Sequence, residues 1–259
     1  MSIVKPDLIL FVGDISEGNI KIIKKVKCLE TPTFVILGNH DRGKDKSGQT
    51  LLKQIRLLDE KYCAWDLKIF DNKINILSGR PCSSGGGYYL SKEVQAVYGP
   101  ISEDDSAKKI IQSSNNATND FPLILMAHSG PTGLGSEANS ICGKDWKKPA
   151  SDWGDRDLAI AIRHIQKNRF LDIVIFGHMH NELKRNLGKR EMFKIDMKGT
   201  IYLNAAVVPR YKLDNEANLL VNFSWLEFNR NQITKISQKW FSESGEVKEE
   251  KTFLEKNTF

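Results

Sequence analysis

The stretch FVILGNHD, residues 34–41, joins an apolar run to a glycine and three polar residues. Residues 34–37 are large and apolar, two of them β-branched, which favours a short buried strand. A strand that ends at Gly38 leaves the polar residues 39–41 at its carboxyl end. Ligand sites in open α/β sheets assemble at the carboxyl ends of strands, so this stretch predicts both an α/β fold and a functional site.

Three further strand-like runs end in the same way. Each is apolar over four or five residues and is followed, after one small residue, by aspartate or histidine. The runs are Leu8–Val12 before Gly13-Asp14, Leu123–Met126 before Ala127-His128, and Ile173–Phe176 before Gly177-His178-Met179-His180. Four of the five histidines therefore stand at predicted strand ends, and the fifth, His164, is interpreted as an ordinary helix residue.

Strand-like and helix-like segments alternate along most of the chain, which indicates a layered α/β architecture. Helical spacing of apolar residues predicts helices near residues 20–29, 51–58, 102–111 and 158–165, with Ser47 and Ser102 as caps of the second and third. Further strands are expected at Ile74–Leu77 and Ile201–Leu203, and a hairpin at Leu219–Phe228 and Ile233–Phe241. We expect one domain over residues 1–241 and a solvated, partly ordered tail over the charged residues 242–259.

The polar residues at the four strand ends form a set that suits a metal ion. The set is rich in imidazole and adds one carboxylate and one carboxamide, but it contains no thiolate. Such a mixture favours borderline divalent ions such as Mn, Fe or Zn over a structural zinc-thiolate site. Each residue alone has an ordinary structural interpretation, and only their joint occurrence at matching strand ends predicts a metal centre.

The ordered motifs GD (13–14), GNHD (38–41), His128 and GHMH (177–180) resemble the calcineurin-like metallophosphoesterase superfamily. The resemblance extends over residues 8–209, and GRPCSSGGG and NAAVVPR are similar to a cyanobacterial and plastid branch. It implies a four-layer αββα sandwich of two mixed β-sheets flanked by helices, with a dinuclear centre of divalent metal ions. It also implies hydrolysis of a phosphomonoester or phosphodiester by metal-activated hydroxide.

The resemblance assigns roles to individual residues. Asp14 would bridge two metals, Asn39, His128 and His178 would complete the ligands of the second metal, and His180 would bind the first. His40 would protonate the leaving oxygen, with Asp41 orienting it. The physical logic is that two cations activate a water and neutralise phosphoryl charge, while a positioned imidazole donates a proton.

One family motif does not occur in this sequence. The family opens with a strand that ends in Asp-x-His, and no Asp-x-His exists among the 259 residues. Residues 3–7 read as the end of a helix that leads into the Leu8 strand, so we expect the first strand to be missing here and to lie upstream in the native protein. The alternative is a one-metal or non-catalytic metal- or phosphate-binding relative.

Composition limits the remaining functional classes. The chain is 40% apolar and 27% charged, typical of a globular protein, and neither a membrane span nor a secretory signal is evident. The four cysteines form no C-x-x-C pair, which indicates reduced thiols. The net charge of +6 is spread along the chain, which indicates a mild attraction for anions and disfavours nucleic acid as a partner. The family resemblance implies a small phosphorylated substrate. We expect a cytoplasmic protein, or a plastid one if the native N-terminus is longer, while the sequence leaves the oligomeric state open.

Several residues near these motifs keep two interpretations. The loop 83–87 is interpreted as a tight turn rather than an anion site, because it lacks the lysine and spacing of a P-loop. Arg42 and Arg210 are either surface residues or contacts to substrate phosphate, and Asn204 is expected near the site. Ser129 lacks the context of a hydrolase nucleophile.

Overall fold

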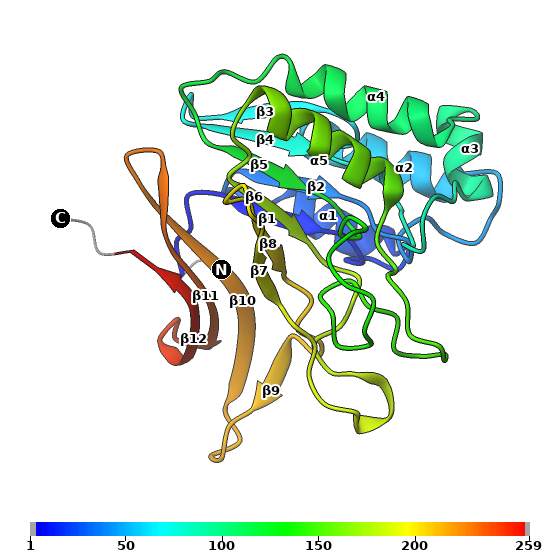
Figure 1. The fold of residues 1–259 in the computed structure, drawn as a ribbon. Helices are drawn as coiled ribbons and strands as arrows, with labels where there is room; N and C mark the ends of the chain where they lie inside the picture. Colours follow the sequence, from blue (N-terminus) through cyan, green and yellow to red (C-terminus); the bar gives the residue numbers. More distant parts are fainter. Residues whose placement is uncertain (1–3, 257–259) are drawn as a thin grey trace.

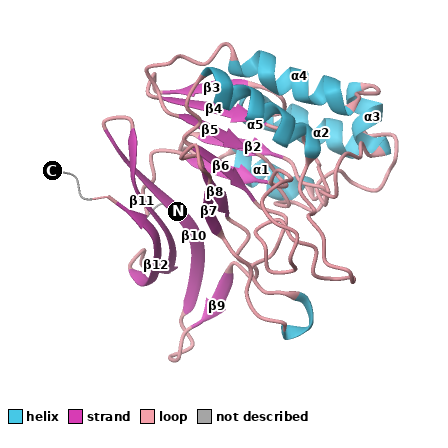
Figure 2. Cartoon of the chain, in the orientation of Figure 1, coloured by secondary structure: helices cyan, strands magenta, loops and turns pink. Residues whose placement is uncertain are grey.

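The computed structural model describes residues 4–256 (Figures 1 and 2). Strands and helices alternate up to β8, after which the chain forms strands only. The helices are α1 (Ile20–Lys27), α2 (Gln49–Leu58), α3 (Lys92–Tyr98), α4 (Glu103–Ser114) and α5 (Arg156–Asn168), with 3-10 turns at Asp59–Lys61 and Lys184–Asn186. The strands are β1 (Ile9–Val12), β2 (Thr33–Ile36), β3 (Leu67–Phe70), β4 (Ile74–Ser78), β5 (Leu123–Met126), β6 (Ile173–Phe176), β7 (Phe193–Ile195), β8 (Ile201–Asn204), β9 (Tyr211–Leu213), β10 (Leu219–Asn229), β11 (Gln232–Ser242) and β12 (Val247–Glu255).

A six-stranded mixed sheet forms the centre of the molecule. Its order is β3-β4-β5-β6-β8-β7, with the four inner strands parallel and the two edge strands antiparallel to their neighbours. Every residue of β5 and β6 is buried, because both faces of these strands are covered. Leu125 and Phe176 pack toward α4 and α5, while Ile124 and Ile175 pack toward the second layer of strands.

The second layer of strands has two parts. β1 and β2 form a parallel pair, and β9–β12 form an antiparallel sheet. Successive side chains of a strand point to opposite faces. Ile36 of β2 therefore joins the core between the layers, whereas Val35 packs with Ile23 of α1 and Leu51 of α2. Helices thus cover both outer sides of the strands, and the predicted four-layer sandwich is confirmed.

The charged C-terminal segment is not a tail. Residues 247–255 form β12, which pairs with β11 at the edge of the antiparallel sheet. Lysines of β11 pair with its acids, as in the 3.0 Å contact between Lys235 and Glu250, while Leu254 packs into the core between the layers. An exposed edge strand is commonly charged, because charge discourages pairing with other chains. The alternating charges therefore mark an edge strand.

Local signals predict some helix ends and miss others. Ser102 caps α4 as expected, since its hydroxyl accepts a hydrogen bond from the Asp105 N–H. Ser47 does not cap α2; Gly48 occupies that position at φ 73°, without a side-chain cap. Helix α3 was not expected, because its seven residues are too short to show helical spacing. None of the helices in residues 4–256 is long and apolar enough to cross a membrane.

Candidate metal centre

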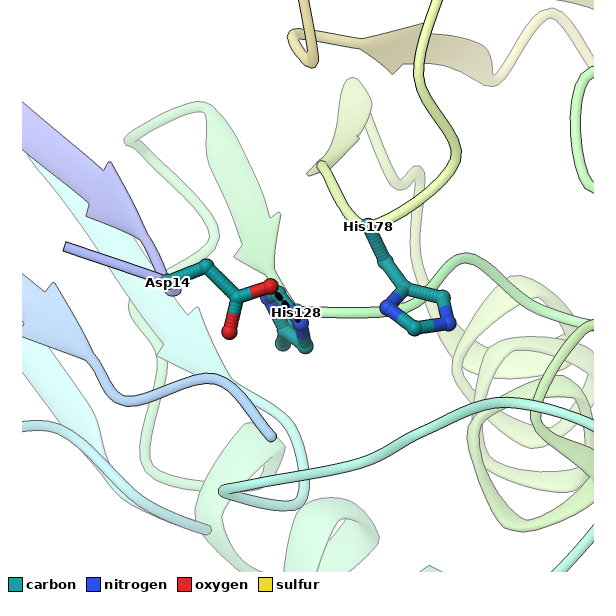
Figure 3. A group of neighbouring side chains, drawn as sticks. All are labelled: Asp14, His128 and His178. Atoms are coloured by element: carbon teal, nitrogen blue, oxygen red, sulfur yellow. Dashed lines mark ion pairs between the residues drawn. The ribbon is translucent and has the colours of Figure 1, made fainter. Parts of the chain in front are cut away.

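Three side chains from three strand ends meet at one point (Figure 3). Asp14 follows β1, His128 follows β5 and His178 follows β6, and each offers a ligand atom within 4.8 Å of the others. The His128 and His178 rings lie edge to face, with centroids 5.1 Å apart. The carboxyl ends of β1, β5 and β6 therefore converge as the sequence predicts.

The contacts of His128 define where a cation fits. Its Nδ1 lies 2.7 Å from the Val12 carbonyl oxygen, so Nδ1 carries the proton and Nε2 of a neutral ring is an acceptor. Nε2 in turn lies 2.9 Å from Asn39 Oδ1 and 3.3 Å from Asp14 Oδ2. Three acceptors that converge in this way need either a proton on Nε2 or a metal ion among them. A ligating histidine characteristically donates its other N–H to a backbone carbonyl, and His128 does so.

The pKa values of Asp14 and His128 reflect the same convergence of acceptor atoms. Burial by itself would raise the pKa of the Asp14 carboxyl, but the hydrogen bond and charge of His128 hold that pKa well below its usual range. Burial opposes protonation of His128, yet the hydrogen bond and charge of Asp14 raise its pKa. A proton on His128 Nε2, between the two side chains, would stand where a cation would lie.

Burial and the charge of His128 favour a neutral His178. They lower the pKa of His178 to about 3, although the charge of Asp14 and the Ser84 backbone favour the protonated ring. His178 itself has a left-handed backbone at φ 64°, which turns its side chain toward Asp14 and His128.

Two glycines allow the strand ends to approach this closely. A methyl group on Gly38 would lie 2.5 Å from the Asp14 nitrogen, 2.6 Å from His128 Cε1 and closer still to Asp14 Oδ1. Gly13 is similarly crowded by the His128 ring and has φ 94°. The glycines of the GD and GNHD motifs therefore make room for the ligands.

Asp41 holds two loops together. Its fully buried carboxylate accepts hydrogen bonds from Gly38 N–H at 2.8 Å and from the N–H and hydroxyl of Ser16 at 2.7 and 2.9 Å. Within residues 4–256, no hydrogen bond joins this carboxylate to the His40 ring. The sequence analysis expects Asp41 to orient His40, but in the structure the Asp41 carboxylate contacts the loops that carry Asp14 and Asn39.

The two remaining histidines of the motifs lie outside the group of three ligands. His40 is exposed, and its backbone N–H donates to Asp14 Oδ1 at 2.9 Å. His180 is also exposed at the surface, and partial desolvation of its ring, with the charge of Lys184, lowers its pKa. The structure thus brings together Asp14, Asn39, His128 and His178, and leaves His40 and His180 beside them.

Supporting residues emerge that the sequence analysis did not identify. Arg190 is buried and donates to the His180 carbonyl at 2.9 Å, and its other nitrogens reach the loop between β5 and α5. Gln54, buried on α2, accepts from the Ser16 hydroxyl at 2.6 Å. In the sequence, the only signal for Gln54 is that a glutamine stands on an otherwise apolar helix face. For Arg190 no local signal exists, because its partners are backbone carbonyls and the carboxylate of Asp145, which is distant in the chain.

Asn204 and Ser129 also lie close to the centre. Asn204 donates to the Met179 carbonyl at 2.7 Å, so it supports the turn between His178 and His180 as expected. The Ser129 hydroxyl is buried and has no hydrogen-bond partner in the described part of the chain.

Other residues with two interpretations are now placed. Arg42 pairs with Glu93 at 3.4 Å, and His164 is exposed on α5. In the glycine-rich loop, the N–H groups of Gly86 and Gly87 donate to the carbonyls of Trp153 and Gly154. That loop is therefore a structural turn whose N–H groups have partners.

The donor set fits a divalent ion. Two neutral imidazoles, one carboxylate and one carboxamide oxygen match the preferences of Mn, Fe and Zn. No cysteine takes part; Cys63, Cys82 and Cys142 are buried and free, and burial raises the pKa of the Cys63 thiol to about 12.

Comparisons with known proteins identify the family and a protein of similar fold. A family model described as calcineurin-like phosphoesterase matches residues 2–182. A dimetal phosphatase from Danio rerio has a similar fold, with a TM-score of 0.51, 8% identity, and coverage of 96% of this chain and 84% of that chain. The protein TT1561 of Thermus thermophilus gives a TM-score of 0.45 at 11% identity, over 88% of this chain and 84% of that one. No curated protein matches the sequence.

Proposed function

Because the chain belongs to the calcineurin-like phosphoesterase family, we propose that it hydrolyses a phosphomonoester or phosphodiester with the aid of divalent metal ions. The observation that carries the proposal is the convergence of three acceptors, in which Asn39 Oδ1 and Asp14 Oδ2 both lie within 3.3 Å of His128 Nε2. Such a set is stable when a cation lies among the acceptors.

The residues offer one metal position with four protein ligands and a second position with two. Asp14, Asn39, His128 and His178 would hold one ion, and His180 with Asp14 would hold a second. A bound divalent ion would supply Lewis-acid activation of water and neutralise charge on the phosphoryl oxygens. Mn, Fe or Zn is the expected metal.

His40 is the proposed general acid. Its ring is exposed, and its backbone is anchored to the Asp14 carboxylate, so the imidazole stands beside the metal position without being a ligand. An imidazole there can protonate the leaving oxygen at neutral pH. Asp41 contributes by fixing the two loops rather than by contact with the ring.

A second candidate is a one-metal or non-catalytic binding protein. It is favoured by the position of His180, which lies outside the group of ligands that meet within 4.8 Å. The substrate of the first candidate is expected to be small and phosphorylated, consistent with the net charge of +6.

Replacement of His40 separates the two candidates. For His40→Asn, we expect turnover of phenyl phosphate, whose leaving oxygen needs a proton, to fall by about 10²-fold or more, while metal content is unchanged. His164→Asn, a change of the exposed histidine on α5, is the matched control and should leave both unchanged. A wild-type protein that binds metal without measurable turnover would favour the binding protein instead.

A further inference from the structure

Two tryptophans lie on the long loop between β5 and α5. Trp146 and Trp153, here called the tryptophan pair, meet edge to face with ring centroids 5.0 Å apart. Trp153 is half-buried, but Trp146 is 38% exposed. An indole held in place by a second indole and open to solvent offers a rigid apolar surface to a planar ligand.

Trp153 borders the candidate metal centre. Its indole N–H donates to the Ser84 carbonyl at 3.0 Å. A methyl group on the next residue, Gly85, would lie 2.7 Å from Trp153 Cδ1 and 3.0 Å from the hydroxyl of Ser129, the residue after His128. The glycine-rich loop therefore lies between Trp153 and the strand end that carries the proposed ligand His128.

The loop beneath the tryptophan pair is rigidly held. The Trp153 carbonyl accepts from Gly86 N–H at 2.7 Å, and the Gly154 carbonyl accepts from Gly87 N–H at 2.9 Å. A methyl group on Gly86 would come within 2.7 Å of the indole ring, so the indole lies directly against the glycine backbone. A surface that is already ordered loses little entropy when a ligand binds.

Positive charge surrounds the tryptophan pair. The Lys144 ammonium lies 5.4 Å from the centre of the Trp153 ring, and Lys147 and Lys148 follow Trp146 as exposed residues. Residues 144–153 contain two acids, and both have partners: Asp145 accepts from Lys184 N–H at 2.7 Å, and Asp152 accepts from Gly133 N–H at 2.6 Å. The segment therefore presents aromatic rings and cations together, a combination that suits a planar ring carrying phosphate.

We propose that the tryptophan pair binds the planar, nucleobase-like leaving group of a phosphoester whose phosphate lies at the metal centre. This substrate class rests on the phosphoesterase activity proposed above. In a nucleoside monophosphate one sugar joins the ring to the phosphate, and in this protein Ser84 and Gly85 lie between Trp153 and Ser129, the residue after the proposed ligand His128.

Ligand binding to the metal-loaded protein tests the proposal without turnover. Isothermal titration would compare adenosine 5′-monothiophosphate, whose ester resists hydrolysis, with inorganic thiophosphate, which has no ring. For Trp146→Leu, we expect affinity for the nucleotide to fall about tenfold, because stacking on one aromatic side chain carries this order of affinity. Affinity for thiophosphate should be unchanged.

Trp240→Leu is the matched control, since Trp240 of β11 also lies under a lysine, with Lys212 4.4 Å from its ring centre. It should bind both ligands as the wild type does. Equal nucleotide affinity in wild type and Trp146→Leu would overturn the proposal, and so would loss of both ligands, because the indole would then only support the loop. If the wild-type protein has no phosphatase turnover but Trp146→Leu still loses affinity for the nucleotide alone, the binding surface is supported and the proposed function is not.

Discussion

A single methyl group on Gly38 is expected to disrupt the metal centre. In Gly38→Ala, the new carbon would lie 2.5 Å from the Asp14 nitrogen and 2.6 Å from His128 Cε1, and closer still to Asp14 Oδ1. Such carbons keep at least 3.0 Å from their neighbours, so the carboxylate and the imidazole must retreat. The φ of Gly38 is not positive, so the effect comes from this crowding and not from backbone strain.

The size of the effect follows from the tolerance of metal sites. Ligand distances in such sites vary by about 0.2 Å, whereas relief of the overlap needs a movement of roughly 0.5–1 Å. We expect metal affinity to fall by about 10- to 100-fold, and turnover by about 100-fold, with a loss of about 1–3 kcal/mol in the free energy of unfolding.

Titration calorimetry with Mn²⁺ or Zn²⁺ and thermal unfolding of the metal-free protein would measure these changes. Gly79→Ala is the matched control, because Gly79 is also buried at a strand end but its methyl group would meet Ala127 Cβ at an ordinary 3.4 Å. If Gly38→Ala bound metal as tightly as Gly79→Ala, Asp14 and His128 would not form the site.

Two further predictions concern buried charges around the centre. Arg190→Met leaves the carbonyls of Ser140, Gly143 and His180 without their donor, so it should lower the free energy of unfolding by about 3 kcal/mol or more in urea titrations. The control Arg169→Met, which frees carbonyls near residue 118, should lower it by less. Equal losses in the two variants would contradict the stabilising role assigned to Arg190. Burial, with the charge of Asp157 and against that of Arg80, raises the pKa of Asp155 from 3.8 to about 7, so its ionisation destabilises the fold as pH rises from about 4 to 7. Asp155→Asn should therefore gain stability relative to wild type across that window, by up to about 1.4 kcal/mol per pH unit, and a constant difference between pH 4.5 and 7.5 would refute the assignment.

Much of the metal centre could be predicted from local sequence. Asp14, His128 and His178 each follow a short apolar strand after one small residue, and parallel strands place such residues at one edge of a sheet. The motifs, taken in their order along the chain, therefore include all three of these residues. The general-acid role of His40 stays a prediction, and so does the place of His180 as a ligand.

The supporting contacts could not be predicted in this way. Asp41 adjoins His40 in the sequence, which suggests that they interact, yet its carboxylate turns to Ser16 and the Gly38 backbone. Arg190 donates mainly to backbone carbonyls, which every residue possesses and which a sequence does not reveal. Their roles depend on which loops meet in space.

The sequence by itself determined the strands that end in the motif residues, those residues and the family, because apolar periodicity and short motifs are local properties. Only the tertiary structure decided that the second layer divides into a parallel pair and an antiparallel sheet, and that residues 247–255 form an edge strand. It also placed Trp153 against the glycine-rich loop that contacts Ser129. Strand pairing and loop packing join residues far apart in the chain, so their energies depend on partners that local patterns do not identify.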